Sequence, residues 1–411
     1  MHGLIFAVIM GLAIVFASGS AQAQCGGLCL YENMTPDMGR SAAGAGARAQ
    51  DSSTAFWNPA GMTELGDGTE VMLGLGAAFS QLNPKLDAGT VSTDSPVVSG
   101  SNIGGFAPLF GSFISTKLPY DVHFGMAIAP LYGGAADYNQ NWAGRVEVTD
   151  LSLFSLLIQP SFAYAVTDWL SLGAGPTVLY SVYEQRLKAT NEALAPTLKI
   201  SNAEDWSAGG VFSALIKPRD GTRIGLTYRT EIVTKLRGNI EGPLGFDPNF
   251  DGKLTFPQGV NVSLFQQVCD EWAITADAGW SDWSKFGNLP LSVGPVGTTV
   301  DLGWNDTWRT AIGFQYVPTE KWTVQGGFGY DSSPVKASKL QPALPVSEQF
   351  RFSTGLLFRP QSYVEIGLNY TFEWFGDMKI DDVPIPGGTV LSGKYDPAYA
   401  NIVGIDLKVK F

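Results

Sequence analysis

The sequence Ile402-Val403-Gly404-Ile405-Asp406-Leu407-Lys408-Val409-Lys410-Phe411 closes the chain and decides its fold class. In a β-strand, the apolar residues from Ile405 to Phe411 would point to one face and the charged residues between them to the other. Such a strand separates an apolar from an aqueous environment. At the C-terminus of a secreted chain it is typical of the closing strand of a bacterial outer-membrane β-barrel, with Phe411 in the aromatic girdle. A half-buried strand of a soluble sheet has the same pattern, so the rest of the chain has to decide.

Residues 1–23 have the pattern of a secretory signal peptide. Leu4 to Phe16 is an apolar run and Ala21-Gln22-Ala23 is a small-x-small cleavage site, which predicts a mature chain starting at Gln24. Beyond this segment no stretch approaches the roughly 20 apolar residues of a membrane helix. Any membrane embedding of the mature chain must therefore use strands.

The composition favours one large β structure over several domains. The 411 residues include 49 Gly, 24 Pro, 24 Phe, 14 Tyr and 11 Trp, and only 16% are charged. The net charge of −12 argues against nucleic acid as a partner, because binding to phosphates needs clustered Lys and Arg. Of the three Cys, Cys25 and Cys29 could form a small oxidised loop, with Cys269 left single. We expect no metal there, since no His lies nearby.

From residue 69 onward, strand patterns follow one another. Fourteen segments alternate apolar with polar residues and carry aromatic residues near their ends, an even number as bacterial single-chain barrels require. The expected strands are 70–80, 104–116, 121–132, 151–165, 169–185, 206–217, 222–237, 253–267, 270–282, 305–317, 321–331, 347–358, 362–374 and 399–411.

The connections between these segments alternate in length. Short polar turns occupy 166–168, 218–221 and 318–320. Longer segments join the other neighbours: 133–150, 186–205, 238–252, 283–304 and 375–398. Short turns at one end and long loops at the other are typical of an outer-membrane barrel. This alternation indicates an all-β membrane protein, a 14-stranded antiparallel transmembrane β-barrel.

Catalytic residues are not found. The mature chain has a single His, His123, which opens a predicted strand and is interpreted as a solvated interface residue. No nucleophile elbow, phosphate loop or dinucleotide fingerprint is present. Charged residues at inward positions are expected to pack and solvate a polar lumen: Arg223, Arg229, Asp277, Glu365 and Lys408. We therefore expect no enzyme activity, no cofactor and no metal.

Two irregular stretches carry the functional hypothesis. Residues 24–68 are small, polar and rich in Gly and Ala, so they need shelter from another part of the protein. Within them, Phe56-Trp57-Asn58-Pro59-Ala60 places two aromatics before Asn-Pro, which restricts Asn58 to extended backbone. An ordinary surface turn would explain this motif equally well.

The second irregular stretch lies in the third expected strand. Pro130, Gly133 and Gly134 break the alternation there. Proline cannot donate to a strand ladder and paired glycines often mark a bulge, which predicts a kink. The alternative is that the strand ends and a loop begins.

Four motifs, taken in order, resemble the bacterial outer-membrane transporters of long-chain fatty acids and aromatic hydrocarbons (the FadL type). The motifs span nearly the whole mature chain: Gly39-Arg40-Ser41 through Asp51 to Asn58-Pro59-Ala60; Gly225-Leu226-Thr227-Tyr228-Arg229-Thr230-Glu231; Asp282-Trp283-Ser284-Lys285-Phe286; and Thr307-Trp308-Arg309 through Trp322 to Tyr330-Asp331-Ser332-Ser333-Pro334-Val335.

The resemblance implies an N-terminal hatch (24–68) that plugs the lumen of a barrel (69–411). A hydrophobic ligand would enter an apolar pocket near the hatch and leave sideways at a kinked third strand. Phe56 to Ala60 would then bind or gate the ligand, and Pro130, Gly133 and Gly134 would form the lateral opening. The segment 186–205 is shorter than the family's apolar loop at this place, which leaves the nature of the ligand open.

We therefore expect passive, ligand-gated uptake of a fatty acid, alkane or aromatic hydrocarbon through the bacterial outer membrane. The expected partners are that ligand, outer-membrane lipid and lipopolysaccharide, and the barrel assembly machinery through the strand ending in Phe411, with the chain as a monomer. A general diffusion porin and a structural or adhesin barrel remain the alternatives.

Overall fold

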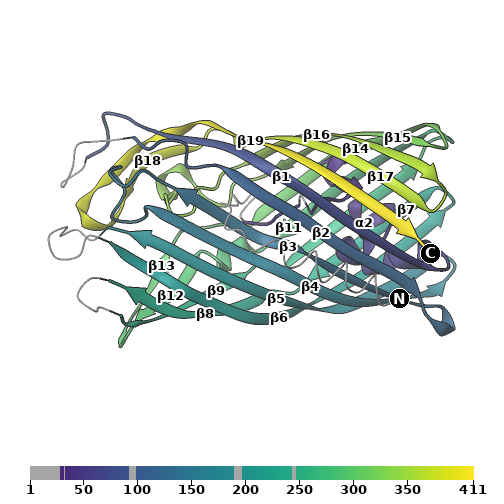
Figure 1. Cartoon of the computed structure of the whole chain (residues 1–411), viewed down its shortest axis with the longest axis horizontal. Coiled ribbons are helices and arrows are strands. Elements are labelled where there is room, and N and C mark those ends of the chain that lie inside the picture. Colours follow the sequence, from purple (N-terminus) through teal and green to yellow (C-terminus); the bar gives the residue numbers. More distant parts are fainter. Residues whose placement is uncertain (1–27, 32, 92–98, 189–196, 243–246) are drawn as a thin grey trace.

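In the computed structural model, which describes residues 28–31, 33–91, 99–188, 197–242 and 247–411, antiparallel strands close into a barrel (Figure 1). Within these ranges fourteen strands form the ring. They are β1 (Thr69–Leu86), β2 (Phe106–Lys117), β3 (Val122–Asp137), β4 (Asp150–Thr167), β5 (Leu170–Leu187), β6 (Leu198–Arg219), β7 (Thr222–Arg229), β10 (Gly259–Gln267), β11 (Trp272–Ser281), β14 (Thr307–Thr319), β15 (Trp322–Asp331), β16 (Gln349–Gln361), β17 (Val364–Trp374) and β19 (Val390–Lys410).

The closing strand seals the ring. β19 pairs with β1 on one side, where Leu75 lies opposite Ile405, and with β17 on the other, where Leu368 lies opposite Ile405. The predicted number of wall strands is thereby confirmed, and so are the short turns. The predicted signal peptide and Cys25 lie outside the described residues.

Five further strands extend the barrel at the end with the long connections. They are β8 (Ile232–Glu241), β9 (Asn249–Phe256), β12 (Asn288–Val293), β13 (Val296–Asp301) and β18 (Lys379–Pro384). The expected strands 222–237 and 253–267 each cover parts of two strands, and much of the expected loop 186–205 belongs to β5 and β6. Strands can continue here because hydrocarbon thickness limits only the part of a strand that crosses the membrane.

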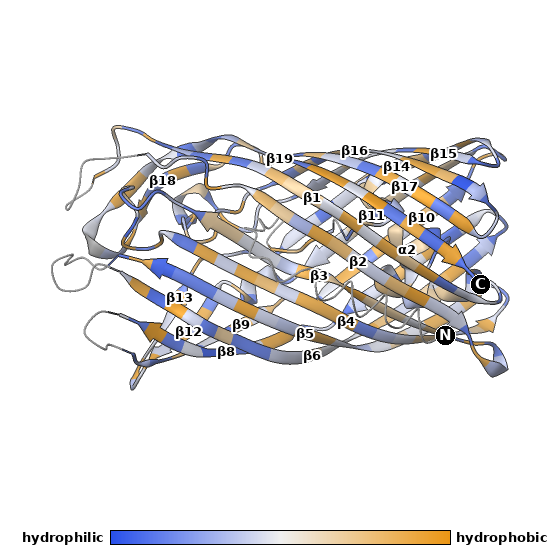
Figure 2. Cartoon of the chain, in the orientation of Figure 1, coloured by the Kyte–Doolittle hydropathy of each residue, from blue (hydrophilic) through white to orange (hydrophobic). Residues whose placement is uncertain are grey.

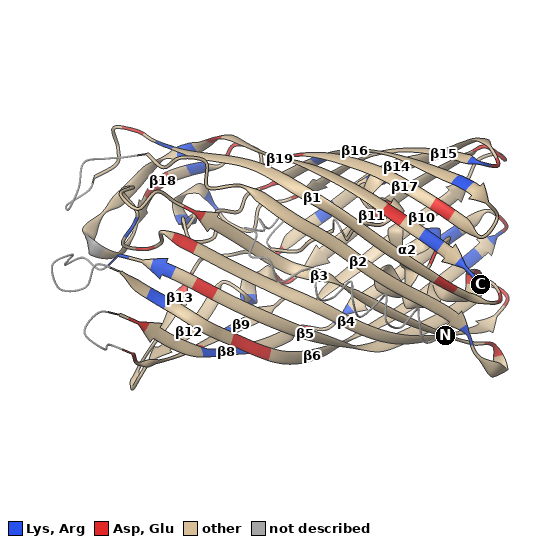
Figure 3. Ribbon diagram, viewed as in Figure 1, with Lys and Arg blue, Asp and Glu red and all other residues tan. Residues whose placement is uncertain are grey.

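The outer wall matches a lipid environment. Val403, Ile405 and Leu407 are exposed on β19, while Asp406 between them is 1% exposed and faces the lumen. Apolar residues recur along the outer strands (Figure 2), and charged residues are sparse over the middle of the visible wall (Figure 3). Exposed tryptophans lie at or beside the ends of the strands: Trp169, Trp272 and Trp322 at the end with the short turns, and Trp308 and Trp374 at the other. This distribution is that of a transmembrane barrel with aromatic girdles.

Apart from isolated β-bridges, short helices make up the rest of the secondary structure of the described residues. They are η1 (Pro36–Arg40), α2 (Ala45–Arg48), α3 (Thr54–Trp57), η2 (Pro59–Glu64), η3 (Pro119–Asp121), η5 (Trp283–Lys285), η6 (Ala337–Lys339) and η7 (Pro386–Gly388). None of the helices in the described ranges has the length and apolarity to cross a membrane.

The lipid-facing position of Ile405 gives a stability prediction. Ile405→Arg places a charge in the middle of the apolar face and should lower the free energy of unfolding in lipid vesicles by about 2–4 kcal/mol. Denaturant unfolding followed by tryptophan fluorescence measures the change. Val300→Arg, on an exposed strand outside the ring, should stay within about 0.5 kcal/mol of the parent. Equal effects of the two changes would contradict the assignment of the lipid face.

Candidate functional site

The segment from Leu28 to Leu65 lies inside the barrel, nearer the end at which β19 finishes (Figure 1). Its helices touch different parts of the wall: η1 packs on β14 to β17, α2 on β7 and β10, and η2 on β3 to β6. Nearly all of its residues are buried. We call it the luminal segment, and it spans the cross-section of the barrel.

Wall glycines let the luminal segment approach the barrel backbone. A Cβ atom at Gly225 would overlap the carbonyl oxygen of Gly46 and would lie 2.8 Å from Nδ2 of Asn58. A Cβ atom at Gly173 would lie 2.8 Å from the carbonyl carbon of Pro59. Real side chains do not tolerate such distances to backbone, so these positions require glycine for close approach.

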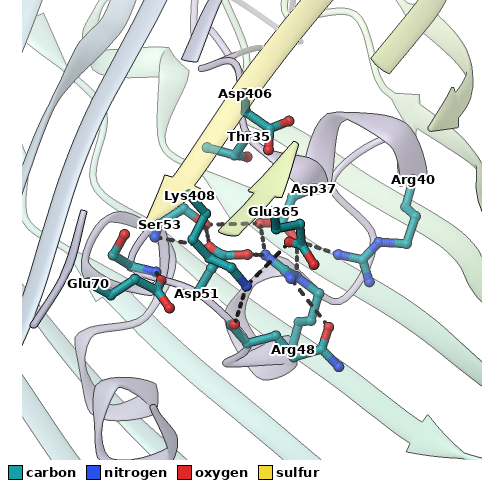
Figure 4. Close-up of polar contacts among 12 residues, drawn as sticks. Thr35, Asp37, Arg40, Arg48, Asp51, Ser53, Glu70, Glu365, Asp406 and Lys408 are labelled. Atoms are coloured by element: carbon teal, nitrogen blue, oxygen red, sulfur yellow. Dashed lines mark hydrogen bonds and ion pairs between the residues drawn. The ribbon is translucent and has the colours of Figure 1, made fainter. Parts of the chain in front are cut away.

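Buried ion pairs fold the luminal segment onto itself (Figure 4). Asp37 pairs with both Arg40 and Arg48, and its Oδ1 lies 2.8 Å from Nε of Arg48. Arg48 also pairs with Asp51. Burial alone would raise the pKa of the Asp51 carboxyl, but Arg48 and Lys408 hold that pKa below its ordinary value. Removing one partner would leave a buried charge uncompensated, so the cluster stabilises a single arrangement of the segment.

The wall joins this cluster from β1, β17 and β19. The backbone N–H of Ser52 donates to Oε1 of Glu70 at 2.5 Å. Lys408 donates to the carbonyl oxygen of Gln50 at 3.4 Å and pairs with Glu365 at 3.3 Å. Of the predicted inward charges on β17 and β19, Glu365 pairs with Lys408, and Lys408 contacts the luminal segment.

The Asn58-Pro59-Ala60 motif is a joint between helices α3 and η2. Asn58 is fully buried, and its Nδ2 donates to the carbonyl oxygens of Gly46 (2.6 Å) and Ala214 (3.0 Å). Its Oδ1 accepts from the N–H of Ala60 and so caps η2, while Pro59 takes the first helical position. The motif is therefore not a surface turn, and its side chains fix the luminal segment to β6.

A cavity of about 110 Å³ lies between the luminal segment and the wall. Phe56 and Trp57 line it from α3, and Leu131 and Tyr132 from β3. Asn58, Pro59 and Ala60 do not line it. The structure thus brings the aromatic pair of the expected hatch to the irregular part of β3, while the Asn-Pro-Ala motif lies behind it.

Several residues of this cavity are not predicted by any pattern in the sequence. Arg309 and Tyr31 line it, as does Arg229, which the sequence marked only as a luminal charge. Tyr31 stacks near Trp57, and the guanidinium carbon of Arg309 lies 4.5 Å from the ring centroid of Tyr31. The alternation in β7 identifies Arg229 as luminal. No sequence pattern indicates that Tyr31 lines the same cavity. Among the described residues, no group of His, Cys, Asp and Glu could hold a metal ion.

Strands β2 and β3 are paired over only part of their length. Pairing runs from Lys117 opposite His123 to Ser112 opposite Ile128 and stops there, and we call the stretch beyond it the unpaired interval. Farther along, the N–H of Asp137 donates to the carbonyl oxygen of Ile103. Inside the interval, the luminal segment pairs with β3, because Cys29 forms a β-bridge with Tyr132. The wall is therefore interrupted between β2 and β3 beside the cavity.

The three irregular residues of β3 lie at this interruption. The strand continues to Asp137 with a register shift against β4 between Pro130 and Tyr132, so no loop begins here. The N–H of Gly133 donates to the carbonyl oxygen of Leu28 at 2.9 Å. Gly134 lines a separate cavity of about 20 Å³. His123, in contrast to the expectation of a solvated position, is 5% exposed on the luminal side of β3.

Loops contact one another at the opposite end of the barrel. Tyr138 donates to the carbonyl oxygen of Pro342 at 2.9 Å, and the N–H of Ala343 donates to Oε1 of Glu147 at 3.3 Å. The Oε2 atom of Glu147 is shielded from solvent and has no hydrogen-bond partner among the described residues. Burial raises the pKa of Glu147 to about 7. This contact joins the loop between β3 and β4 to the loop between β15 and β16.

Comparisons with known proteins agree on one family. A model described as "Outer membrane protein transport protein (OMPP1/FadL/TodX)" matches residues 16–411. A long-chain fatty acid transport protein of Salmonella typhi is 26% identical over 397 residues, covering 87% of this chain and 90% of that protein. Outer membrane protein P1 of Haemophilus influenzae is 22% identical and covers 98% of both chains.

Two solved structures share the fold. A FadL homologue from Pseudomonas aeruginosa superposes with a TM-score of 0.85 at 22% identity, covering 94% of this chain and 100% of that one. The toluene transporter TodX of P. putida superposes with a TM-score of 0.65 at 16% identity, covering 88% of this chain and 94% of that one.

The close approach of the luminal segment to Gly225 suggests a substitution that would displace the segment. Gly225→Val should leave the barrel folded but push the segment around Gly46 and Asn58 away, because the new side chain overlaps its backbone. Cleavage of the segment by an added protease should become faster, and currents across planar bilayers should rise. Gly210→Val is the control, since a Cβ there meets no atom closer than the Phe212 ring at 3.4 Å and would lie 3.7 Å from the carbonyl oxygen of Gly175, both ordinary contacts. An unchanged rate of proteolysis in the Gly225→Val variant would contradict the close contact between the luminal segment and Gly225.

The buried carboxyl of Glu147 predicts a pH effect on stability. Its pKa is raised in the folded protein, so the folded state binds more protons than the unfolded state between about pH 4.5 and 7. This contribution to stability is present below pH 4.5 and is lost as the pH rises to about 7. The melting temperature should fall over this range, and Glu147→Gln should flatten that part of the profile. A parallel profile in the variant would contradict the assignment.

Proposed function

Since this chain belongs to the outer-membrane transport protein family that includes FadL and TodX, we propose that it takes up hydrophobic compounds, long-chain fatty acids or related hydrocarbons, by passive diffusion. The family and the barrel fold place it in the bacterial outer membrane. A long-chain fatty acid transport protein and a toluene transporter are among its relatives, so both ligand types are considered.

One observation carries the proposal: the luminal cavity lies beside the unpaired interval between β2 and β3. Leu131 and Tyr132 belong to both, since they line the cavity and lie on the β3 edge that β2 leaves free. A ligand in the cavity would thus be next to a break in the wall. The proposed route runs from the outer loops to the cavity and then sideways between Pro130–Gly134 and β2 into the membrane.

The physical chemistry favours such a route for apolar ligands. Exposure to water costs about 0.8 kcal/mol per CH₂ group, so a water-filled pore does not help an alkyl chain across. The cavity offers aromatic and aliphatic surfaces instead, from Phe56, Trp57 and Leu131. The transfer is downhill and needs no cofactor.

In this proposal residues 24–68 form the hatch, and the luminal segment is the part of it that the structure describes inside the barrel. It occupies the lumen and would keep water from crossing until a ligand arrives. Phe56 and Trp57 contact the ligand, and Asn58, Pro59 and Ala60 transmit its arrival to the contacts with β6. The hydrogen bonds of the buried Asn58 side chain to Gly46 and Ala214 support this assignment of contact and transmission roles.

A general diffusion porin is the competing function, and electrical measurement separates the two. The buried luminal segment should keep the conductance of the intact protein low. Large, steady currents from the intact protein in planar bilayers would favour the porin and contradict the hatch.

Filling the unpaired interval should block transport. Ala129, the residue of β3 just beyond the last pair with β2, is fully buried, and Ala129→Trp should reduce uptake of a labelled fatty acid at least about tenfold by occupying the route. Ala174→Trp, on the exposed outer face of β5, should transport at the parental rate. Heat-modifiable migration in gels verifies that both barrels fold. Undiminished uptake by a folded Ala129→Trp variant would refute the lateral route.

A further inference from the structure

Two lysines lie opposite each other on the outer face of the strands beyond the ring. In the antiparallel register of β8 and β9, Lys235 is the direct partner of Lys253. Both side chains are exposed, while the residues that follow them, Leu236 and Leu254, are buried in the apolar interior. Like charges directly opposite on one face of a strand pair destabilise it. An anion between the two ammonium groups would remove this repulsion.

The described part of the chain places no carboxylate within ion-pair distance of either ammonium group. Two acidic residues on the neighbouring positions have other partners. Asp205 of β6 accepts the backbone N–H of Lys235 at 2.8 Å. Asp251 of β9 lies 3.7 Å from Nε of Arg237, and both of these side chains are exposed. The lysine pair is therefore a cationic site that its surroundings leave uncompensated.

A second pair of opposed lysines in the same barrel is compensated. Lys85 of β1 lies opposite Lys394 of β19 in the register of those strands. A carboxylate oxygen of Asp396 lies 3.1 Å from Nζ of Lys85 and 3.2 Å from Nζ of Lys394. One carboxylate thus serves both cations. Since the β8–β9 pair has the same arrangement without the carboxylate, an anion from outside the chain can take that place.

The uncompensated pair lies at the height of lipid head groups. Along β6, the outward residues from Trp206 toward the short turns are apolar or glycine, whereas Glu204 follows on the other side. Trp206 is exposed, and its ring centroid lies 4.8 Å from that of Tyr180. Aromatic residues of this kind mark the limit of the apolar face, and long connections mark the outer side of the membrane. Because the N–H of Lys235 donates to Asp205, next to Trp206, the pair lies just outside this limit.

A groove of about 470 Å³ lies beside the lysine pair. It extends from β8 and β9 to the hairpin of β12 and β13, and the hairpin contributes the hydroxyl groups of Ser292, Thr298 and Thr299 to its lining. Hydroxyl groups can donate to and accept from the hydroxyls of a sugar. The groove is also larger than a phosphate group alone requires. Cations beside hydroxyl groups in one groove match a phosphorylated sugar.

We propose that Lys235 and Lys253 bind a phosphate on the sugar head group of lipopolysaccharide in the outer leaflet, with the sugar in the groove beside them. Ammonium groups form charge-assisted hydrogen bonds with phosphate oxygens, which are stronger than bonds between neutral groups. The site lies on the outer face of the barrel, outside the lumen. It is therefore independent of which compound the barrel transports.

Binding of lipid A, the phosphorylated disaccharide lipid of lipopolysaccharide, tests the proposal with the purified full chain in detergent. Native mass spectrometry measures the affinity. The double variant Lys235→Gln with Lys253→Gln should bind lipid A at least about tenfold more weakly than the parent, because two cations near an anionic surface are lost. Added salt should weaken binding in the parent more than in this variant.

The compensated lysine pair provides the matched control. Lys85→Gln with Lys394→Gln removes the same number of cations at the same end of the barrel, but from a pair that Asp396 already serves. This control should keep the parental affinity for lipid A. Heat-modifiable migration in gels verifies that each barrel is folded.

A charge reversal separates binding from a structural effect. Lys253→Glu gives Lys235 a carboxylate of the chain itself, so it should lose lipid A as the double Gln variant does. Without lipid, its melting temperature should rise above that of the parent, since opposite charges across a strand pair stabilise it. A fall in melting temperature would contradict the repulsion from which the site is inferred.

Two other anions decide whether the occupant is the sugar phosphate. The parent should bind lipid A more tightly than phosphatidylglycerol, which has no sugar for the groove, and more tightly than inorganic phosphate. Equal affinity for lipid A in the parent and the double Gln variant overturns the site. Binding of phosphatidylglycerol or inorganic phosphate as tight as that of lipid A overturns the assignment to a phosphorylated sugar.

Discussion

The closed circuit of backbone pairing is the constraint on which the rest of this structure depends. Hydrocarbon offers no partner for an N–H or C=O group, so each strand that crosses the membrane must pair on both sides. The ring closes through β19, which joins β1 and β17. Pairing between β2 and β3 nevertheless stops at Ser112 and Ile128. The interruption is tolerable because β3 pairs with the luminal segment there. The N–H of Leu30 donates to the carbonyl oxygen of Leu131, and the N–H of Gly133 donates to the carbonyl oxygen of Leu28.

The luminal segment is fixed in two different ways on two sides. Toward β7 and β5 it lies on glycines, and Gly225 and Gly173 let backbone meet backbone. Toward β1, β17 and β19 it meets charged and polar wall residues such as Glu70 and Lys408. Buried ion pairs contribute little net stability, since desolvation offsets their attraction, but they disfavour other arrangements of the segment. These contacts keep the luminal segment in one position. Because they are spread over separate strands, one of them can break while the others remain.

The luminal cavity lies where the luminal segment and two parts of the wall come together. The aromatic end of α3, the interrupted edge of β3 and an arginine of β7 all border the same small volume. Phe56 contributes its ring to the cavity and its carbonyl to Arg229. One residue therefore connects whatever occupies the cavity with the helix that precedes Asn58. This arrangement makes a luminal cavity next to a break in the wall more than an accidental packing gap.

The sequence by itself determined the barrel. Alternation with a period of two is a local property, visible in residues such as Ile405 and Asp406, and the lengths of turns and loops need no knowledge of distant contacts. The hairpin of β12 and β13 escaped prediction, because it is largely exposed and has no buried face to enforce a pattern, whereas β8 and β9 were merged with the neighbouring wall strands β7 and β10. Only the tertiary structure decided the site. Gly225 and Asn58, or Tyr31 and Arg309, meet through long-range packing inside the closed ring, and no local periodicity records which luminal side chains share a cavity.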